Sequence, residues 1–265
     1  MNKIQLFFLL RKNKKLSEKR NVMFEANQYG KFFAYLGFAF FVLYFMAIGT
    51  FLGWAAVNED EYQMIFILLP FLLIIDFFGR FVSQQTPVML VKPYLLMPFS
   101  RYTAVECFLV SQLIDASNFV WMSLFLPYTF ICVCGSMTLL QGLVMLLLLH
   151  LMILVNSQWY LLVRTLVNRS LFWWALPVIV YGAVIVPLFF LADKSVEKIF
   201  DQVFDFIGEY AFSWQSFLLF IVCFRGLFLI NRKMQMRFIY DEISKQEKTK
   251  LKHVSEFSAL NRFGQ

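Results

Sequence analysis

Charged side chains are scarce in this sequence. Asp, Glu, Lys and Arg make up 15% of its 265 residues, against about 25% in an average soluble domain. There are only two histidines, His150 inside a long apolar run and His253 near the C-terminal end. Because they lie so far apart, we expect neither a bis-histidine haem site nor a histidine metal cluster. We interpret His150 as an incidental or interhelical hydrogen-bonding residue, with a proton relay as the alternative.

Recognisable catalytic patterns are missing as well. The sequence contains no HExxH zinc motif, no GxSxG nucleophile motif and no Walker-type phosphate loop, which membrane proteases, hydrolases and ATPases use for their chemistry. The four cysteines form no CxxC pair and lie in or beside apolar runs, which favours packing over metal or disulfide chemistry. We therefore expect no enzyme activity, no catalytic residues, no cofactor and no metal site.

Long apolar runs are what the sequence does contain. Hydrophobic residues make up 60% of the chain, and Phe alone occurs 34 times. The runs cover residues 32–57, 63–83, 104–133, 138–163, 171–192 and 213–231. Each is close to or above the roughly 20 residues that a helix needs to cross the hydrocarbon core, and none shows the alternation of a membrane β-strand. The sequence predicts an all-α, polytopic membrane protein with six transmembrane helices across residues 32–231.

The charges between the runs alternate in sign. Residues 1–31 carry eight Lys and Arg against two acids, and the tail 232–265 carries eight against four. The first hairpin, 57–62, is purely acidic, and the segment 192–212 holds five acids against two lysines. Basic loops stay on the cytoplasmic side of membranes. We therefore predict a multi-pass protein of the bacterial plasma membrane with both termini in the cytoplasm. The net charge of +7 reflects this topology and indicates no nucleic-acid binding.

Two segments outside the runs have helical patterns of their own. In residues 1–31, Ile4, Phe7, Phe8 and Arg11 fit an amphipathic helix lying along the inner membrane surface, with a flexible basic leader as the alternative. In 192–212, apolar residues recur at helical spacing, at Val196, Ile199, Phe200, Val203, Phe204 and Ile207. This pattern predicts an extracytoplasmic amphipathic helix before the sixth span. The charged tail 232–265 favours a cytoplasmic extension of that span.

The cytoplasmic loop between the second and third spans is unusually apolar. Its central residues are Lys92, Pro93, Tyr94, Leu95, Leu96, Met97, Pro98, Phe99 and Arg101. Large apolar side chains at an aqueous surface are costly unless something covers them. We interpret this loop as a docking element for a partner protein. The alternative is a connector that lies in the lipid headgroups.

Ionisable and amide side chains inside the runs form the last group of candidates: Asp76, Arg80, Glu106, Asp115, Asn118, His150 and Arg225. A charge at mid-membrane costs about 2.5–3.5 kcal/mol on insertion scales. Asp76 and Arg80 are four residues apart and share a helix face, so we expect a self-neutralising pair, with Arg80 also able to reach the cytoplasmic surface. Asp115 and Arg225 lie at similar depth and suggest an interhelical ion pair. A substrate path is the alternative role.

The order of these features resembles a type-2 ABC exporter permease. In that family the loop after the second span, here residues 84–103, carries the coupling helix, which binds the ATPase subunit. The stretch YLLMPFSRYTAVE resembles the segment at which such permeases re-enter the membrane, with its Tyr, Leu, Pro, Ser and Arg. More narrowly, LFFLLRKNKK, KPYLLMPFSR and EFSALNRFGQ resemble uncharacterised Bacteroidetes membrane proteins grouped with ABC permeases. In that narrower family a second membrane half follows a sequence like LNRFGQ. The resemblance implies three partners: an ABC ATPase subunit, a second permease copy or half, and membrane lipids.

The sequence thus suggests the permease subunit of an ATP-driven transporter that exports an amphiphilic substrate. Residues 92–99 and Arg101 would form the loop that couples it to a separate ATPase. A different class of function is also consistent with the sequence, a membrane-embedded structural or assembly factor that transports nothing. A lipid-modifying enzyme is disfavoured because the polar groups it would need are missing.

Overall fold

Helices are the regular elements of the chain in the computed structural model, which describes residues 3–19, 28–83, 101–189 and 213–262 together with Gln202 and Tyr210. Within these residues there is no β-strand. The predicted docking loop up to residue 100 and the predicted outer amphipathic segment 192–212, apart from Gln202 and Tyr210, lie outside the described residues. The all-α fold class is confirmed for the part of the chain that is described.

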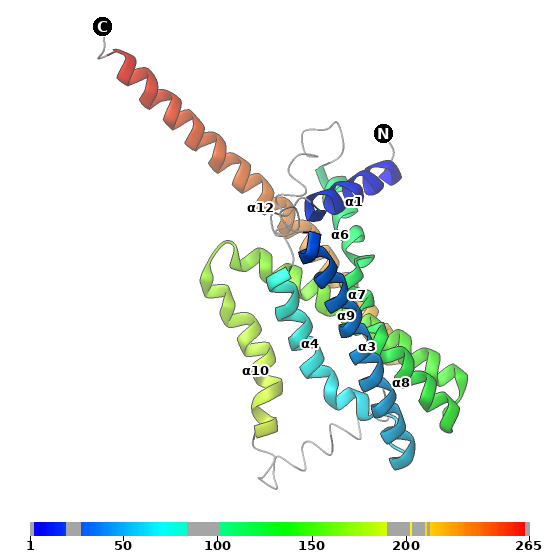
Figure 1. Ribbon diagram of the computed structural model, residues 1–265. Helices are drawn as coiled ribbons and strands as arrows, with labels where there is room; N and C mark the ends of the chain where they lie inside the picture. Colours follow the sequence, from blue (N-terminus) through cyan, green and yellow to red (C-terminus); the bar gives the residue numbers. More distant parts are fainter. Residues whose placement is uncertain are drawn as a thin grey trace.

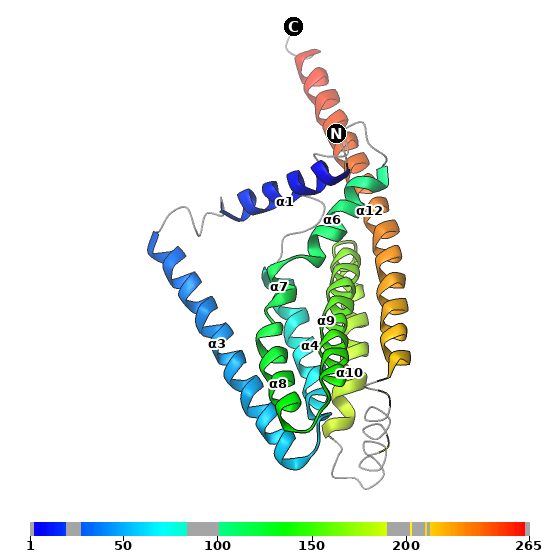
Figure 2. The same ribbon diagram turned by 90° about the vertical axis from the view of Figure 1, so that its right-hand side faces the viewer.

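Most helices run roughly side by side along one axis, and one crosses them at an end (Figures 1 and 2). The bundle helices are α3 (Gln28–Glu59), α4 (Met64–Ser83), α8 (Met122–Gly135), α9 (Leu139–Val167), α10 (Ala175–Phe189) and α12 (Trp214–Arg262). The crossing helix is α1 (Lys3–Lys19), which packs against α6 (Arg101–Leu113). A short 3₁₀ turn, η2 (Leu171–Trp174), leads into α10. The predicted helical tail is confirmed, because α12 continues without interruption to Arg262.

Among the residues that the structure describes, four helices are long and apolar enough to cross a membrane: Tyr35–Glu59, Met64–Phe81, Leu139–Val167 and Trp214–Ile239. A bent helix pair, Tyr102–Phe119 with Met122–Gly135, adds a fifth span if the pair crosses as one. The predicted run 171–192 gives a shorter apolar helix, Leu171–Ala183, within the described residues. The chain is therefore a membrane-embedded helical protein whose described part contains four or five helical segments long enough to span, and the sixth span stays a prediction.

The third predicted run, 104–133, is not one straight helix. It is divided into α6, the one-turn helix α7 (Ala116–Phe119) and α8, with a bend of 61°. Asp115 has an extended backbone, and its carboxylate accepts a hydrogen bond from the Ala116 amide at 3.1 Å. The Asn118 amide donates to the carbonyls of Gln112 at 2.7 Å and Leu113 at 3.0 Å. These side chains satisfy backbone groups that the break leaves unpaired, as a low-dielectric environment requires.

The apolar core consists of two clusters, one above the other along the bundle. The first joins α3, α4, α8 and α9 and contains Phe45, Leu69, Phe125 and Ile153. The second joins α1, α4, α6, α9 and α12 and contains Leu6, Phe77, Phe108, Tyr160 and Ile239. Along α4 and α9 the two clusters adjoin near Asp76 and Asn156, so the polar residues of these helices lie at the boundary between them.

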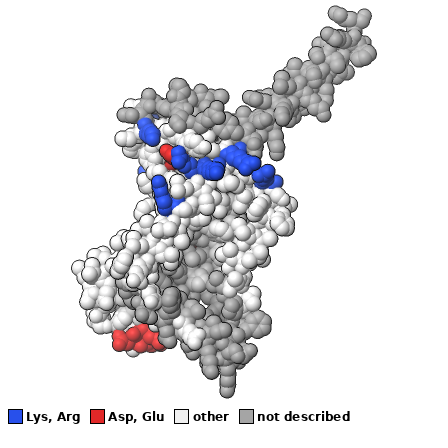
Figure 3. Space-filling model, turned by 180° about the vertical axis from the view of Figure 1, so that it is seen from behind, with Lys and Arg blue, Asp and Glu red and all other residues white. Residues whose placement is uncertain are grey.

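Charge is divided between the two ends of the bundle. Figure 3 shows Lys and Arg gathered across the end where α1 crosses, and a compact acidic patch at the opposite end. We call the first the basic end; it includes the exposed Lys12, Arg169 and Lys233. The second, the acidic end, carries Glu59, Asp60 and Glu61, the hairpin between α3 and α4. The alternation of loop charge along the sequence thus becomes an end-to-end asymmetry of the fold.

The N-terminal segment is helical over Lys3–Lys19, which form α1. Leu6 and Leu10 of α1 are buried in the second apolar cluster, whereas Ile4 and Phe8 are 67% and 60% exposed. One face of α1 therefore packs on the protein, and the exposed apolar side chains on another part of its surface are available to lipid. Its position along a membrane surface stays a prediction.

Candidate functional site

An ion pair at the boundary between the two apolar clusters is the centre of the candidate site. Arg80 Nε lies 2.8 Å from Asp76 Oδ2, one turn away on α4, and both side chains are at most 4% exposed. The spacing of four residues places the two groups on one face of the helix. The predicted self-neutralising pair is confirmed. Arg80 does not extend to an aqueous surface, because its guanidinium is held inside the bundle.

Two neighbouring helical segments supply further partners to Asp76, and a third is joined to it through one of them. The Trp121 indole, at the start of α8, donates to Asp76 Oδ1 at 2.7 Å. The Asn156 amide of α9 donates to Asp76 Oδ2 and to the Leu73 carbonyl, both at 2.9 Å. Tyr181 of α10 completes the chain by donating to Asn156 Oδ1 at 2.9 Å. One carboxylate therefore connects α4, α8, α9 and, through Asn156, α10.

The guanidinium of Arg80 is satisfied by serines on two other elements. One terminal nitrogen donates to Ser117 Oγ of α7 at 3.2 Å and to Ser157 Oγ of α9 at 3.3 Å. The other donates to the Ser117 carbonyl at 3.4 Å. A buried ion pair is tolerated where its remaining donors and acceptors are also paired. We refer to Asp76, Arg80, Ser117, Trp121, Asn156, Ser157 and Tyr181 as the polar cluster.

The chemistry of the polar cluster is that of a connection between helices. Each oxygen of Asp76 already accepts a hydrogen bond, so the carboxylate is engaged by its own helix and by two neighbouring segments. No group of three or more His, Cys, Asp or Glu suitable for a metal ion occurs among the residues that the structure describes. The arrangement fixes the relative positions of four helices: a shift of α4, α8 or α9 has to break hydrogen bonds to a charged group, and a shift of α10 breaks the neutral bond between Tyr181 and Asn156.

A second polar site lies at the basic end and corrects a sequence prediction. Asp115 does not pair with Arg225; its Oδ2 lies 2.7 Å from Lys14 Nζ of α1. Arg225 of α12 is instead exposed, 5.9 Å from the Phe228 ring centre. The prediction assumed a straight third span in which Asp115 lay deep. Because the helix is broken at this residue, Asp115 comes close to α1.

A third ion pair joins α6 to α12. Arg232 Nε lies 2.8 Å from Glu106 Oε1, and each side chain is about one-third exposed. The Arg232 guanidinium also lies 4.6 Å from the centre of the Tyr102 ring. Helix α6, which directly follows the predicted docking loop, is thus tied to α12 by charge and packed against α1.

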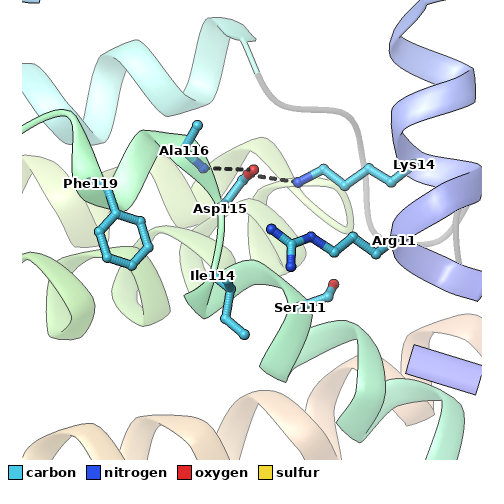
Figure 4. Close-up of a pocket in the computed structure, with 7 residues that line it drawn as sticks. All are labelled: Arg11, Lys14, Ser111, Ile114, Asp115, Ala116 and Phe119. Carbon is cyan, nitrogen blue, oxygen red and sulfur yellow. Dashed lines mark hydrogen bonds and ion pairs between the residues drawn. The ribbon is translucent and has the colours of Figure 1, made fainter. Parts of the chain in front are cut away.

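A pocket of about 390 Å³ opens beside the break, between α1 and the α6–α7 segment. Figure 4 shows Arg11 and Lys14 reaching into it from α1, and Ser111, Asp115 and Phe119 facing them from the other side. Ile114 and Ala116 complete the lining. Both cationic and apolar groups therefore meet in one opening.

The structure separates the remaining predicted residues. His150 of α9 lies beside the Phe119 ring at 5.4 Å, and its Nδ1 is buried without a hydrogen-bond partner among the described residues. The Asn118 side chain donates a hydrogen bond to a backbone carbonyl at the break and takes part in no ion pair. Residues 92–99 lie outside the described residues, and Arg101 is the first residue of α6.

Several residues of these sites were not found by sequence reasoning. Trp121, Asn156 and Tyr181 belong to apolar runs, and they become partners of Asp76 only through packing of different helices. Between α9 and α12, Asn231 donates to the Gln158 carbonyl at 2.7 Å, and Gln235 is buried beside α9 with no hydrogen bond from its side chain to the described residues. The signal available in the sequence was the recurrence of amides in otherwise apolar helices, which are enriched at membrane helix contacts.

The comparison with protein families gives one match that covers nearly the whole chain. A sequence model described as "Family of unknown function (DUF5687)" matches residues 14–265, and the chain belongs to that family. No curated protein and no solved structure matches the chain.

Proposed function

We propose that this member of the DUF5687 family is the membrane subunit of an ATP-driven transporter, energised by a separate ATPase that binds at the basic end. The observation that carries the proposal is the pair of helices that the segment 84–100 joins in the sequence. This loop connects α4, which carries the Asp76–Arg80 pair, directly to α6, which carries Glu106 and leads into the broken helix. A force on this loop would act on both polar sites.

The surroundings of α6 support the same function. α6 contacts both α1 and α12, so the three elements form a connected layer at the basic end. Figures 1 and 2 show α12 extending beyond this layer and α1 lying across the bundle. A partner bound to the loop would therefore act on a layer in which α1, α6 and α12 move together.

The lateral surface of the bundle is apolar, as a surface in contact with lipid and with a second permease copy or half would be. Large apolar side chains along α3, among them Phe33, Tyr35 and Phe40, are more than 60% exposed. In a membrane this surface is stable against lipid tails or against another apolar helix. The substrate we propose is amphiphilic and exported, because the bundle offers apolar helix surfaces together with paired internal charges.

The coupling proposal is tested with purified protein in nanodiscs and the ATPase subunit that co-purifies with it. Leu96→Asp and Phe99→Asp are expected to release the ATPase while the thermal stability of the membrane subunit is unchanged. Arg101→Ala is expected to weaken the association less, since a charge at the rim of an interface contributes under about 1 kcal/mol.

A charge reversal separates coupling from binding. Glu106→Arg or Arg232→Glu is expected to leave ATPase binding intact and to uncouple ATP hydrolysis from transport, because α6 loses its connection to α12. The double reversal restores the opposite charges and is expected to recover coupling. Failure of any Walker-type ATPase to co-purify would favour a structural or assembly factor. Loss of folding together with binding in the Asp variants would indicate that the loop is buried within the subunit itself.

A further inference from the structure

The pocket at the basic end contains an excess of positive charge. Two cations, Arg11 and Lys14, and one carboxylate, Asp115, line it, which leaves a formal charge of +1. Lys14 and Asp115 neutralise each other at 2.7 Å. The Arg11 side chain forms no ion pair or hydrogen bond within the part of the chain that the structure describes, although it is partly buried. Figure 4 shows its guanidinium between Asp115 and Ser111, facing the pocket.

A partly buried guanidinium has a strong preference for an anion that accepts several hydrogen bonds in one plane. Phosphate and carboxylate groups have this geometry, and arginine binds them through two parallel N–H donors. Asp115 offers one such group, but its Oδ2 is already taken by Lys14 and its Oδ1 by the Ala116 amide. The donors of Arg11 are therefore available to a ligand in the pocket.

The opposite wall of the pocket is apolar. Ile114 and Phe119 are 42% and 49% exposed, and both belong to the broken third span, at the end of the bundle where α1 crosses it. A small inorganic anion would leave these side chains uncovered. An anion attached to a hydrocarbon chain would cover them, and basic pockets between helices at the cytoplasmic membrane surface bind such headgroups.

We propose that this pocket binds the phosphate of an anionic phospholipid, with Arg11 holding the phosphate oxygens and the first part of an acyl chain lying over Ile114 and Phe119. Lys14 neutralises the Asp115 carboxylate, which would otherwise repel the phosphate, and Ser111 lines the polar side of the pocket. The bound lipid fixes α1 against the break between α6 and α7. This site stands independently of the proposed ATPase coupling, since it needs only the membrane position of α1.

Native mass spectrometry of the delipidated full-length protein tests the proposal. The probes are phosphatidylglycerol and phosphatidylcholine with identical acyl chains, added at equal concentration. One phosphatidylglycerol is expected to bind more tightly than phosphatidylcholine. Arg11→Gln is expected to weaken phosphatidylglycerol binding about fivefold, the effect of one basic side chain at a membrane surface. The matched control is Lys12→Gln, which removes the same charge from an exposed neighbouring position and is expected to leave the affinity unchanged.

A steric variant and a competition experiment complete the test. Ala116 lines the pocket and is exposed, so Ala116→Trp fills the space without changing any charge and is expected to abolish the tight phosphatidylglycerol adduct. This variant decides the matter if Arg11→Gln lowers the melting temperature. Equal effects of Arg11→Gln and Lys12→Gln would overturn the proposal in favour of diffuse attraction. Unchanged binding in Ala116→Trp would overturn it too, and displacement of the lipid by millimolar inorganic phosphate would instead indicate a free-phosphate site.

Discussion

The Asp76–Arg80 pair shows how single residues stabilise a bundle that has almost no charge inside it. Hydrogen bonds to charged groups contribute about 1.5–3 kcal/mol each, and Asp76 accepts them from Arg80, Trp121 and Asn156. These bonds offset the cost of placing the carboxylate in a low-dielectric region. The pair is therefore stable only as a unit, because either charge alone would be buried without compensation.

This reasoning predicts non-additive effects of substitution. Asp76→Asn and Arg80→Met should each lower the free energy of unfolding by about 3–5 kcal/mol, the cost of leaving one buried charge unpaired. The double variant has no unpaired charge and should lose much less than the sum of the two. Unfolding measured in lipid nanodiscs or bicelles, arranged as a double-mutant cycle, gives the coupling energy.

A control distinguishes this effect from general loss of a buried polar group. Thr165 of α9 is also buried, and its hydroxyl donates to the Leu161 carbonyl one turn earlier in the same helix. Thr165→Val should therefore have a small effect, under about 1.5 kcal/mol. If the Asp76 and Arg80 variants each lost as little free energy of unfolding as Thr165→Val, and if the two losses added up in the double variant, the pair would not act as a unit.

Sequence reasoning reached the pair but not its surroundings, and the reason is geometric. Residues four apart on one helix are neighbours whatever the rest of the fold does, so Asp76 and Arg80 could be matched from their spacing. The partners Trp121 and Asn156 come from other helices, and their contacts depend on helix rotation and tilt, which apolar runs do not encode. Matching Asp115 to Arg225 by depth failed because the third span is broken at Asp115, which brings its carboxylate to Lys14 of α1.

At the scale of whole helices, the broken third span is the main departure from the prediction. Average hydropathy over residues 104–133 is high enough to hide a break of a few residues. The local sequence Asp115–Ala116–Ser117–Asn118 carries the missed signal, since Asp, Ser and Asn favour helix caps over helix interiors. The four long spans, by contrast, agree with their predicted runs. A continuous helix pairs all its backbone groups within one segment, so a long apolar run without capping residues stays helical in lipid.

A second helix-scale feature, the contact of α3 with α8, depends on glycine. Gly49 and Gly53 form a GxxxG pattern, which brings membrane helices into close backbone contact. A Cβ atom at Gly49 would lie 2.3 Å from the Leu124 carbonyl oxygen, and one at Gly53 3.0 Å from that of Tyr128. Backbone atoms cannot move aside locally, so a side chain at Gly49 has to push the two helices apart.

Gly49→Ala is accordingly expected to lower the free energy of unfolding by about 1–3 kcal/mol, the usual cost of overpacking. Gly37 of the same helix provides the matched control, because a Cβ atom there meets nothing within 4 Å. Gly37→Ala should be neutral or slightly stabilising, since alanine is the better helix former by roughly 0.5–1 kcal/mol. Thermal unfolding of both variants in the same nanodiscs is the measurement, and equal losses would contradict close packing at Gly49.

For the molecule as a whole, the separation of charge between the two ends predicts an orientation in the membrane. The acidic end and the basic end are at opposite ends of the helices (Figure 3), and the positive-inside rule assigns the basic end to the cytoplasm. The bundle and its charge asymmetry were predictable because both follow from composition along the chain. The number of crossings was harder to predict, because the pair Tyr102–Phe119 and Met122–Gly135 is bent and the helix Leu171–Ala183 is short.

Labelling of single cysteines resolves the number of crossings. Cys107 and Cys132 are buried, so replacing the exposed Cys134 and Cys223 by serine leaves a background with little reactivity. New cysteines are then placed singly at exposed positions between the helices. The acidic hairpin is probed at 61 and not at 60, because Asp60 has a φ of 58°, a conformation that a cysteine adopts only with strain.

The expected pattern follows the two ends of the bundle. In intact cells an impermeant maleimide should label Glu61→Cys and Leu139→Cys, whereas Arg169→Cys and Lys233→Cys should react only after permeabilisation. Position 139 follows the bent pair, and position 61 precedes α4. If cysteines at both positions react in intact cells, both lie outside, and α6, α7 and α8 must then cross the membrane as one span. Labelling of Arg169→Cys but not of Leu139→Cys in intact cells would mean that the pair re-enters without crossing, because α9 then carries the chain outward. Lys233→Cys reacting in intact cells would contradict the cytoplasmic basic end, and with it the surface on which the proposed ATPase has to bind.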